Sequence, residues 1–419
     1  MRSTLVKALP ALLFYAPAAA FLSSSPSSSL RTAVLRPALE GDDDKWSLKG
    51  LERQGARAPR KSNDRASLSV PNGIGISTYA WGDSSRGYMS SYNPADLQGA
   101  YNAAVEEELL YFDTSEAWGK EYRGKDISAE QLVGNFASEN YDSKPVIATQ
   151  FDPSLLAAVP PRVGKAAVVK ALEDSLERMG LAYLDHYQIA NPTRLYPGGR
   201  RALYEGLAMC KERRLCGTIG VCNFNAKQVV HAHEGLASFG VVLASNSVGL
   251  SALDQTRLED GTVDACKRLG VTVLAHSPLQ GALASGRYTQ TNPTGGKTMK
   301  VQAGLTSGGG RAGKFTLDEL KRAQPLHAAL TAVARQVGAR EGFKVTPAQV
   351  AVNWCVAKGT VPVVGVTNTK DAREAAGCIG WRLRASDMEA LDAAAVKCKS
   401  VRAGAERPDM SMWKDVRQK

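Results

Sequence analysis

The sequence predicts an α/β fold of the (β/α)8 TIM-barrel class, formed by a single domain over residues 70–400 and preceded by a targeting presequence. Three observations support this prediction. Short apolar runs alternate with longer helical patterns eight times over about 320 residues, the order expected of a parallel barrel. No glycine fingerprint follows the first run, which disfavours the alternative, a doubly wound open sheet. The 419 residues, 44% of them hydrophobic, also suffice for a large core.

The eight expected strands are short runs of apolar or β-branched residues. Because a helical segment separates each run from the next, we expect the strands to pair in parallel. They are Gly75–Ala80, Leu109–Phe112, Pro145–Thr149, Tyr183–Ile189, Gly217–Val221, Val242–Ser245, Val271–Ala275 and Val361–Val364.

The helical segments carry apolar residues three or four positions apart, as Val169, Leu172 and Leu176 show. Thr346 followed by Pro347 is typical of a helix start, with a capping residue and a proline in the first turn. The expected helices are Pro94–Glu108, Ser128–Ala137, Lys165–Met179, Arg201–Arg213, Ala226–Ser238, Thr262–Leu269, Leu317–Val337 and Pro347–Ala357.

A long insertion, Gln280–Gln324, separates the last two strands. Its middle is rich in Gly and Lys, so we expect a mobile loop over the barrel mouth. Gly308–Lys314 has the spacing of a phosphate-binding loop, but Phe315 follows it where Ser or Thr is needed, and no strand precedes it. A flexible loop is the better interpretation.

The N-terminal region has the composition of a targeting sequence. Residues 1–20 have basic residues, an apolar stretch and small residues at the end, the pattern of a signal peptide. Residues 21–45 are similar to a transit peptide, and together the two segments resemble the bipartite presequences of algal plastid proteins. Residues 46–69 are expected to be a charged linker and 401–419 a C-terminal tail. The predicted location is the plastid stroma, with secretion as the alternative, and no transmembrane segment is expected in the mature chain.

The cysteines and the charge exclude several classes of function. Seven cysteines without disulfide-like spacing favour a reducing compartment. Cys210, Cys216 and Cys222 lie six residues apart, which is no metal-ligand spacing, and no metal is expected. Cys222 alone, near the expected barrel mouth, is a candidate for redox sensitivity; a small buried residue is the alternative. Of the net charge of +11, residues 1–65 carry +5 and the rest is dispersed, which disfavours nucleic-acid binding.

Motifs at the expected strand ends resemble those of the aldo-keto reductase superfamily, and the plant and algal plastid type in particular. The run Ala376–Leu383 is similar to the Ala-Gly-x-x-Gly-Trp-x-Leu tail of that type. The other matching segments are Tyr79–Asp83, Tyr111–Gly119, Leu181–Pro192, Gly217–Phe224, Ala244–Ser247, His276–Pro278 and Gly365–Trp381.

The resemblance implies that a small carbonyl compound is reduced by NADP(H). In the family, a tyrosine gives the proton, a lysine paired with an aspartate activates the tyrosine, and a histidine orients the carbonyl. The aspartate is retained here as Asp113. The other three positions hold Trp118, Gln150 and Ala190, which gives a degenerate catalytic tetrad.

These replacements are not chemically equivalent to the residues they replace. An indole N–H does not release its proton at any working pH, glutamine carries no charge, and alanine has no polar side-chain atom. Asp113 is then an unpaired carboxylate with a raised pKa, or it caps the following loop. One replacement acid is Tyr122, with Lys120 or Lys125 beside it. The alternative function is a catalytically silent barrel that binds a nucleotide or a protein partner.

The cofactor site implied by the resemblance is partly retained. Ser247 stands where the family usually has glutamine, and Thr367 and Asp371 stand where plant relatives have other polar or basic residues. An aspartate repels a 2′-phosphate, which Lys370 and Arg373 would offset, so NADP(H) binding is expected to be weak. The implied cofactor-binding residues are Asn223, Asn246, Ser247, His276, Ser277, Leu279, Gly365, Thr367, Asp371 and Glu374.

Overall fold

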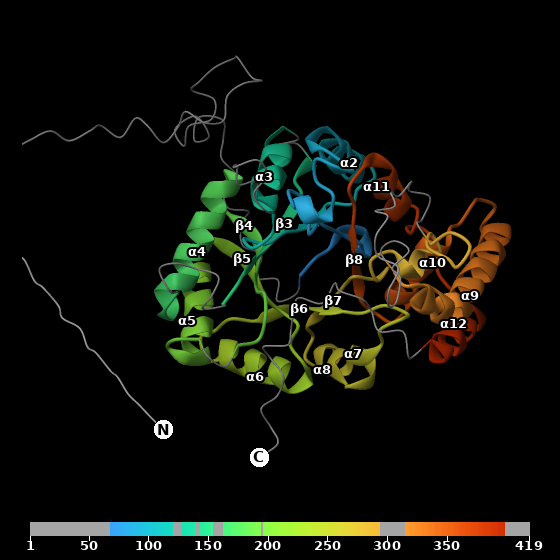
Figure 1. Cartoon of the computed structure of the whole chain (residues 1–419). Coiled ribbons are helices and arrows are strands. Elements are labelled where there is room, and N and C mark those ends of the chain that lie inside the picture. The colour runs from blue at the N-terminus through green and yellow to red at the C-terminus, as the bar shows by residue number, and fades with distance from the viewer. Residues whose placement is uncertain are drawn as a thin grey trace, which may run out of the picture. The chain divides into compact units, whose positions relative to one another are not determined.

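A computed structural model describes residues 68–119, 128–139, 143–153, 162–193, 196–293 and 315–398. Eight parallel strands form a closed barrel in the order of the sequence, and helices surround it (Figure 1). The predicted (β/α)8 barrel is therefore confirmed. The segments assigned to the signal peptide, the transit peptide and the C-terminal tail lie outside the described residues, as does the loop 308–314.

Each strand of the barrel overlaps the one predicted from the sequence. The strands are β1 Gly75–Ser77, β2 Tyr111–Asp113, β3 Val146–Phe151, β4 Leu184–Ile189, β5 Cys216–Cys222, β6 Leu243–Gly249, β7 Thr272–His276 and β8 Val361–Gly365. The first strand is shorter than predicted because the chain turns after Ser77. The amide of Trp81 donates to the carbonyl of Thr78 at 2.8 Å, which closes this turn.

All eight predicted helices are present with small shifts at their ends. They are α2 Pro94–Glu106, α3 Ala129–Glu139, α4 Gly164–Met179, α5 Gly199–Glu212, α6 Ala226–Ala237, α8 Thr262–Arg268, α9 Leu317–Glu341 and α10 Pro347–Ala357. Asn93, Thr316 and Thr346 each begin a helix with a reciprocal capping box. The start predicted at Thr346 and Pro347 is therefore confirmed.

Three helices were not predicted. They are α7 Thr256–Glu259, α11 Thr369–Ala376 and α12 Ala385–Lys397. A capping signal was available for α11, since the side chain of Asn368 accepts the amide of Asp371 at 3.0 Å. The helix follows β8 directly and therefore begins at the mouth of the barrel.

The barrel interior is apolar at one end and polar at the other. Its amino-terminal end is filled by the cluster Leu68, Tyr111, Ala148, Ala244, Leu274 and Val363. Gly75 is required there, because a Cβ atom would lie 2.6 Å from Cδ1 of the Tyr111 ring. Towards the carboxyl ends of the strands, where the active sites of such barrels lie, the interior side chains become polar.

None of the described helices is long and apolar enough to cross a membrane. All seven cysteines are free and buried. Cys222, the candidate for redox sensitivity, is 2% exposed, and burial raises the pKa of its thiol well above the usual value. Because the thiolate is the reactive form, the alternative interpretation of a small buried residue fits Cys222 better.

Candidate active site

Asp113, the last residue of β2, points into the barrel and is 3% exposed. Its partners are two side-chain amides. Nε2 of Gln150 lies 3.1 Å from Oδ2 and 3.3 Å from Oδ1, and Nε2 of Gln188 lies 3.0 Å from Oδ1. Burial raises the pKa of Asp113 to about 7, although both amide donors lower it. The raised pKa follows the sequence-based expectation, but the carboxylate binds these amides and is not a cap for the following loop.

Sequence reasoning did not single out Gln188. It lies in β4, two residues after His186 and two before Ala190. Because side chains alternate along a strand, all three face the barrel interior. The same alternation would have identified Gln188 from the sequence. Its carbonyl oxygen accepts a hydrogen bond from Sγ of Cys222 at 3.5 Å, so the carboxylate, the two glutamines and the thiol form one buried network.

His186 lies two residues before Gln188 on the inner face of β4, deeper in the barrel. Its Nδ1 is 2.8 Å from the hydroxyl of Thr218, and its Nε2 is 2.7 Å from the hydroxyl of Ser245. Burial lowers the pKa of His186 to about 3, so the ring is neutral at physiological pH. Both ring nitrogens are bound to hydroxyls below the mouth, which makes His186 a structural residue.

Trp118 lies in the loop after β2, at the carboxyl end of the barrel. Its ring system and that of Tyr79 pack in a T-shaped arrangement, with centroids 5.2 Å apart and planes at 72°. The Trp118 carbonyl accepts the amide of Ala129, the first residue of α3, at 3.1 Å. The position that holds the catalytic tyrosine in the family therefore packs against a second aromatic ring.

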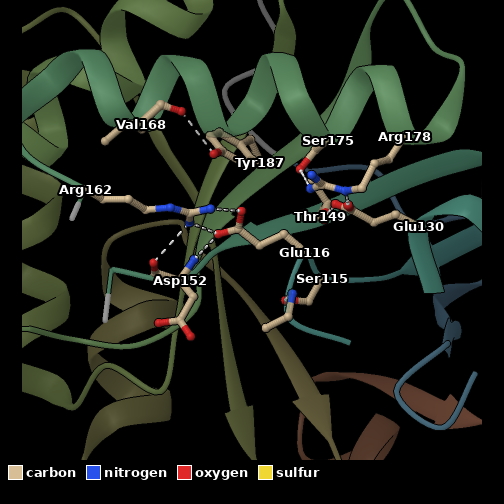
Figure 2. A network of polar contacts seen from close by, with 11 residues as sticks. Ser115, Glu116, Glu130, Thr149, Asp152, Arg162, Val168, Ser175, Arg178 and Tyr187 are labelled. Carbon is tan, nitrogen blue, oxygen red and sulfur yellow. Dashed lines mark hydrogen bonds and ion pairs between the residues drawn. The ribbon is translucent and has the colours of Figure 1, made fainter. Parts of the chain in front are cut away.

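A buried ion pair holds this loop two residues before Trp118 (Figure 2). Nη2 of Arg162 lies 2.8 Å from one carboxylate oxygen of Glu116, and the other oxygen accepts the amide of Asp152 at 2.7 Å. The Glu116 side chain is 6% exposed. The pair joins the loop after β2, which also carries Trp118, to the chain that follows β3.

Ala190 directly follows β4 and brings no side-chain polar atom to the mouth. Its carbonyl accepts Nδ2 of Asn223 at 3.2 Å, and the same amide lies 3.0 Å from Oδ1 of Asn191. Nε2 of His276, at the end of β7, lies 3.0 Å from Oδ1 of Asn223. Burial lowers the pKa of His276 to about 4. The ends of β4, β5 and β7 are therefore joined by a chain of neutral polar groups.

Four further residues of the implied cofactor site fall into two groups. Ser277 and Leu279 follow β7 and are partly exposed at the mouth. Ser247 and Asn246 are buried in β6. The amide of Asn246 donates to the carbonyl of Phe224 at 2.9 Å, so Asn246 supports the turn after β5 from beneath.

Asp371 caps the start of α11 from within the helix. Its Oδ2 accepts the backbone amide of Thr367 at 3.2 Å, the Thr367 hydroxyl at 3.0 Å and Nδ2 of Asn368 at 2.9 Å. Gly365, at the end of β8, is exposed beside this turn. A negative charge thus already occupies the helix N-terminus that would otherwise attract a phosphate.

Glu374 lies one turn further along α11. Its Oε1 accepts the hydroxyl of Thr346 at 3.0 Å, which links α11 to α10. Lys370 and Arg373 are exposed on the same helix, and Nη2 of Arg373 lies 3.8 Å from the carboxylate of Glu106. Both basic residues are thus close to Asp371 in the sequence of the helix, but the ion pair of Arg373 is with Glu106.

The candidate replacement acid, Tyr122, and its neighbours Lys120 and Lys125 lie outside the described residues. Within the described part of the chain, no group of three His, Cys, Asp or Glu side chains is placed to hold a metal ion.

A sequence model of the aldo/keto reductase family matches residues 73–396, which is nearly the whole barrel. The chain belongs to the aldo/keto reductase family. Among curated proteins, it is 30% identical over 334 residues to the chloroplastic pyridoxal reductase of Arabidopsis thaliana, covering 77% of this chain and 82% of that one. An uncharacterized oxidoreductase of Mycobacterium bovis is 27% identical over 339 residues, covering 80% of this chain and 93% of the relative.

Solved structures show the same fold at lower identity. The thermostable aldo-keto reductase Tm1743 in complex with epalrestat has a TM-score of 0.55 and 19% identity, covering 77% of this chain and 94% of that one. A Klebsiella pneumoniae aldo/keto reductase in complex with NADP and acetate has a TM-score of 0.56 and 19% identity, covering 79% and 93%. The predicted family and fold are confirmed.

Proposed function

We propose that this family member is an NADP(H)-linked oxidoreductase that reduces a small carbonyl compound at the barrel mouth, without the proton-transfer residues usual in its family. The observation that carries the proposal is the contact of Gln150 with Asp113, at 3.1 Å and 3.3 Å. The resemblance implies a lysine at position 150, and the neutral amide of Gln150 takes its place. The contact with Asp113 is therefore kept, but the ion pair is lost. Any proton must therefore come from elsewhere at the mouth.

The groups at the ends of β5 and β7 fit a nicotinamide. His276 is a flat ring, partly exposed and neutral because burial lowers its pKa to about 4; a neutral ring does not repel the cationic oxidised nicotinamide. The amide of Asn223 lies beside it, at 3.0 Å from Nε2, and has donors and acceptors suited to a carboxamide. When bound, the reduced nicotinamide supplies a hydride to the carbonyl carbon.

The adenosine end is expected to be bound more weakly. Asp371 places a carboxylate at the start of α11, and Lys370 and Arg373 offset it only from exposed positions. Fluorescence titration with NADPH and with NADH tests the cofactor proposal. Saturable binding below millimolar concentration is the expected result, and no binding of either nucleotide up to millimolar concentration would refute it.

A second candidate function is a catalytically silent barrel that binds a nucleotide or a protein partner. It is favoured by Trp118, Gln150 and Ala190, because none of these side chains can release a proton at working pH. Without general acid catalysis, a rate falls by about 10²–10⁴. The two functions therefore predict different activities for the unmodified protein.

The triple variant Trp118→Tyr, Gln150→Lys, Ala190→His separates the candidates. Because the Gln150 amide already contacts Asp113, a lysine at this position reaches the carboxylate. The parent and the variant are assayed with NADPH against a panel of small aldehydes that includes pyridoxal, the compound in the name of the Arabidopsis relative. An active parent supports the oxidoreductase. A silent parent with an active variant supports the silent barrel with an intact cofactor site.

The proposed location is the plastid stroma, with secretion as the alternative. The composition of residues 1–45 supports it, and so does the chloroplastic relative. Fusion of residues 1–69 to a fluorescent protein tests it in an alga: plastid fluorescence is expected, and fluorescence in the medium would indicate secretion. Tyr122 is the candidate acid suggested by the sequence alone. Unchanged activity of Tyr122→Phe would exclude it.

A further inference from the structure

We propose that the hydroxyl of Tyr79, paired with the guanidinium of Arg86, delivers the proton to the carbonyl oxygen during reduction. This inference rests on the proposed oxidoreductase function and names a catalytic residue for it. Neither side chain belongs to the four positions that carry catalysis in the family, and the sequence analysis did not assign either of them a catalytic role.

Tyr79 lies at the same end of the barrel as Trp118. Tyr79 lies two residues beyond the end of β1, and the last residue of β1, Ser77, pairs in register with Asp113. Both Tyr79 and the loop that carries Trp118 therefore leave the barrel at the same end, from adjacent strands. The contact of Tyr79 with Trp118, at 5.2 Å between centroids, places a phenol beside the position that holds the tyrosine in the family.

Arg86 brings a positive charge to the hydroxyl of Tyr79. The Arg86 guanidinium carbon lies 3.8 Å from the centroid of the Tyr79 ring, and Nη2 of Arg86 donates a hydrogen bond to the Tyr79 hydroxyl oxygen. Arginine is always charged in proteins. A cation that donates to a phenol oxygen stabilises the phenolate left after proton transfer. Arg86 thus offers the charge that Gln150 cannot.

The guanidinium of Arg86 is held by a further contact within its own loop. Nε of Arg86 lies 3.1 Å from Oδ2 of Asp83. The other carboxylate oxygen of Asp83 accepts the amide and the hydroxyl of Ser85, at 2.8 and 2.6 Å. The guanidinium is therefore held by an ion pair within the same loop as well as by the phenol. A catalytic group needs this kind of support from its surroundings.

The proposed step is balanced in atoms and electrons. The reduced nicotinamide passes a hydride to the carbonyl carbon and becomes the oxidised nicotinamide. The electron pair of the carbonyl π bond moves to oxygen, which takes the proton of the Tyr79 hydroxyl, so an alcohol forms. The phenolate beside Arg86 then regains a proton from solvent, to which Tyr79 is partly exposed.

A purely structural role for the same contacts predicts a different result. In that case, Arg86 and Tyr79 only hold the loop after β1 against Trp118, and removal of the hydroxyl changes stability or substrate affinity instead of the rate of chemistry. The decisive variant is Tyr79→Phe, because it keeps the ring and both ring contacts. Tyr88→Phe is the matched control, since Tyr88 is a buried tyrosine in the same segment.

The experiment measures kcat and KM for aldehyde reduction by NADPH, together with NADPH binding by fluorescence. For Tyr79→Phe we expect kcat to fall by about 10²–10⁴, while KM and NADPH binding change less than about threefold. Arg86→Gln should lower kcat, Arg86→Lys should restore part of it, and Tyr88→Phe should leave it unchanged. An active parent with unchanged kcat in Tyr79→Phe overturns this inference alone. A parent inactive on the whole aldehyde panel overturns the proposed oxidoreductase function, and this inference with it.

A second measurement needs neither cofactor nor substrate. Tyrosinate absorbance is followed during alkaline titration of the cofactor-free protein. Arg86 stabilises the phenolate, and Asp83 is the acidic group paired with Arg86. Because Arg86 also lowers the pKa of Tyr92, the titrations are done in a Tyr92→Phe background, where one tyrosine should ionise at higher pH in Arg86→Gln than in the parent. This transition should be absent in Tyr79→Phe and present in Tyr88→Phe. Identical titrations of the parent and Arg86→Gln would refute the pairing on which the proposal depends.

Discussion

The neutral side-chain amide of Gln150 contacts the carboxylate of Asp113 inside the barrel, and its Nε2 atom lies within 3.3 Å of both carboxylate oxygens. The amide satisfies the acceptors without supplying charge. The two amide donors do not offset the burial of this charge, and burial raises the pKa of Asp113 to about 7.

The first prediction concerns this carboxylate. Its pKa is about 7 in the folded protein against 3.8 for a free aspartate, so the folded state binds the proton more tightly. Stability should therefore fall as pH rises from about 4 to about 7. Asp113→Asn should remove this fall and raise the free energy of unfolding at pH 8 by on the order of 1–4 kcal/mol. Urea unfolding at pH 4.5 and pH 8 measures the effect.

The control for Asp113→Asn is Glu389→Gln, since Glu389 is an exposed carboxylate on α12. We expect the Glu389→Gln variant to have the same stability as the parent at both pH values. If Asp113→Asn were equally destabilised at pH 8 and pH 4.5, the buried carboxylate would be stabilising and the prediction would be wrong.

The second prediction has the opposite sign. Burial lowers the pKa of His186 from 6.5 to about 3, so the unfolded chain binds the proton more tightly. Stability from the neutral ring is present above pH 6.5 and should be lost as pH falls towards 3. His186→Gln should therefore lose less stability between pH 6.5 and pH 4 than the parent, although the lost hydroxyl contacts lower its stability at pH 7 by about 1–3 kcal/mol.

Thermal unfolding at a series of pH values tests this second prediction. His231→Gln is the matched control, because His231 is exposed on α6. If the stability of the parent and that of His186→Gln fell in parallel as the pH was lowered, His186 would not determine stability in acid.

Features that depend on neighbouring residues in the sequence could be predicted, and contacts between distant segments could not. Alternation of runs and capping residues such as Thr346 are local, and they located the eight strands and eight helices. The replacements proposed at Trp118, Gln150 and Ala190 come from the resemblance of motifs at the strand ends, and they stay a prediction. Strand alternation places Gln188 on the inner face, but its contact with Asp113 depends on the closed barrel. The pairing of Tyr79 with Arg86 depends on how the loop after β1 folds back, and the contact of Tyr79 with Trp118 joins two loops. The sequence pattern alone predicts none of these contacts.

The third prediction concerns the buried carboxylate of Glu130 (Figure 2). Its side chain is 0% exposed; it accepts Nε of Arg178 at 2.6 Å and the hydroxyl of Thr149 at 2.6 Å. Arg178→Met leaves this charge without a cation, so we expect a loss of about 3–5 kcal/mol in the free energy of unfolding. Denaturant unfolding at pH 7.5 measures it.

Lys170→Met serves as the comparison for Arg178→Met. Lys170 forms an exposed ion pair with Asp174 on the same helix, α4, and exposed pairs of this kind contribute little to stability. Equal losses in the two variants would mean that the buried position of Glu130 does not matter.

The last prediction concerns thiol reactivity. All seven cysteines are buried, and burial raises the pKa of the Cys222 thiol well above its usual value. Because thiolate is the nucleophile, iodoacetamide at pH 7.5 should modify none of the seven within minutes in the folded protein. All seven should react once guanidinium unfolds the chain, as mass spectrometry would show. Rapid modification of Cys222 in the folded protein would instead mean that the barrel mouth opens and that this thiol is available for oxidation.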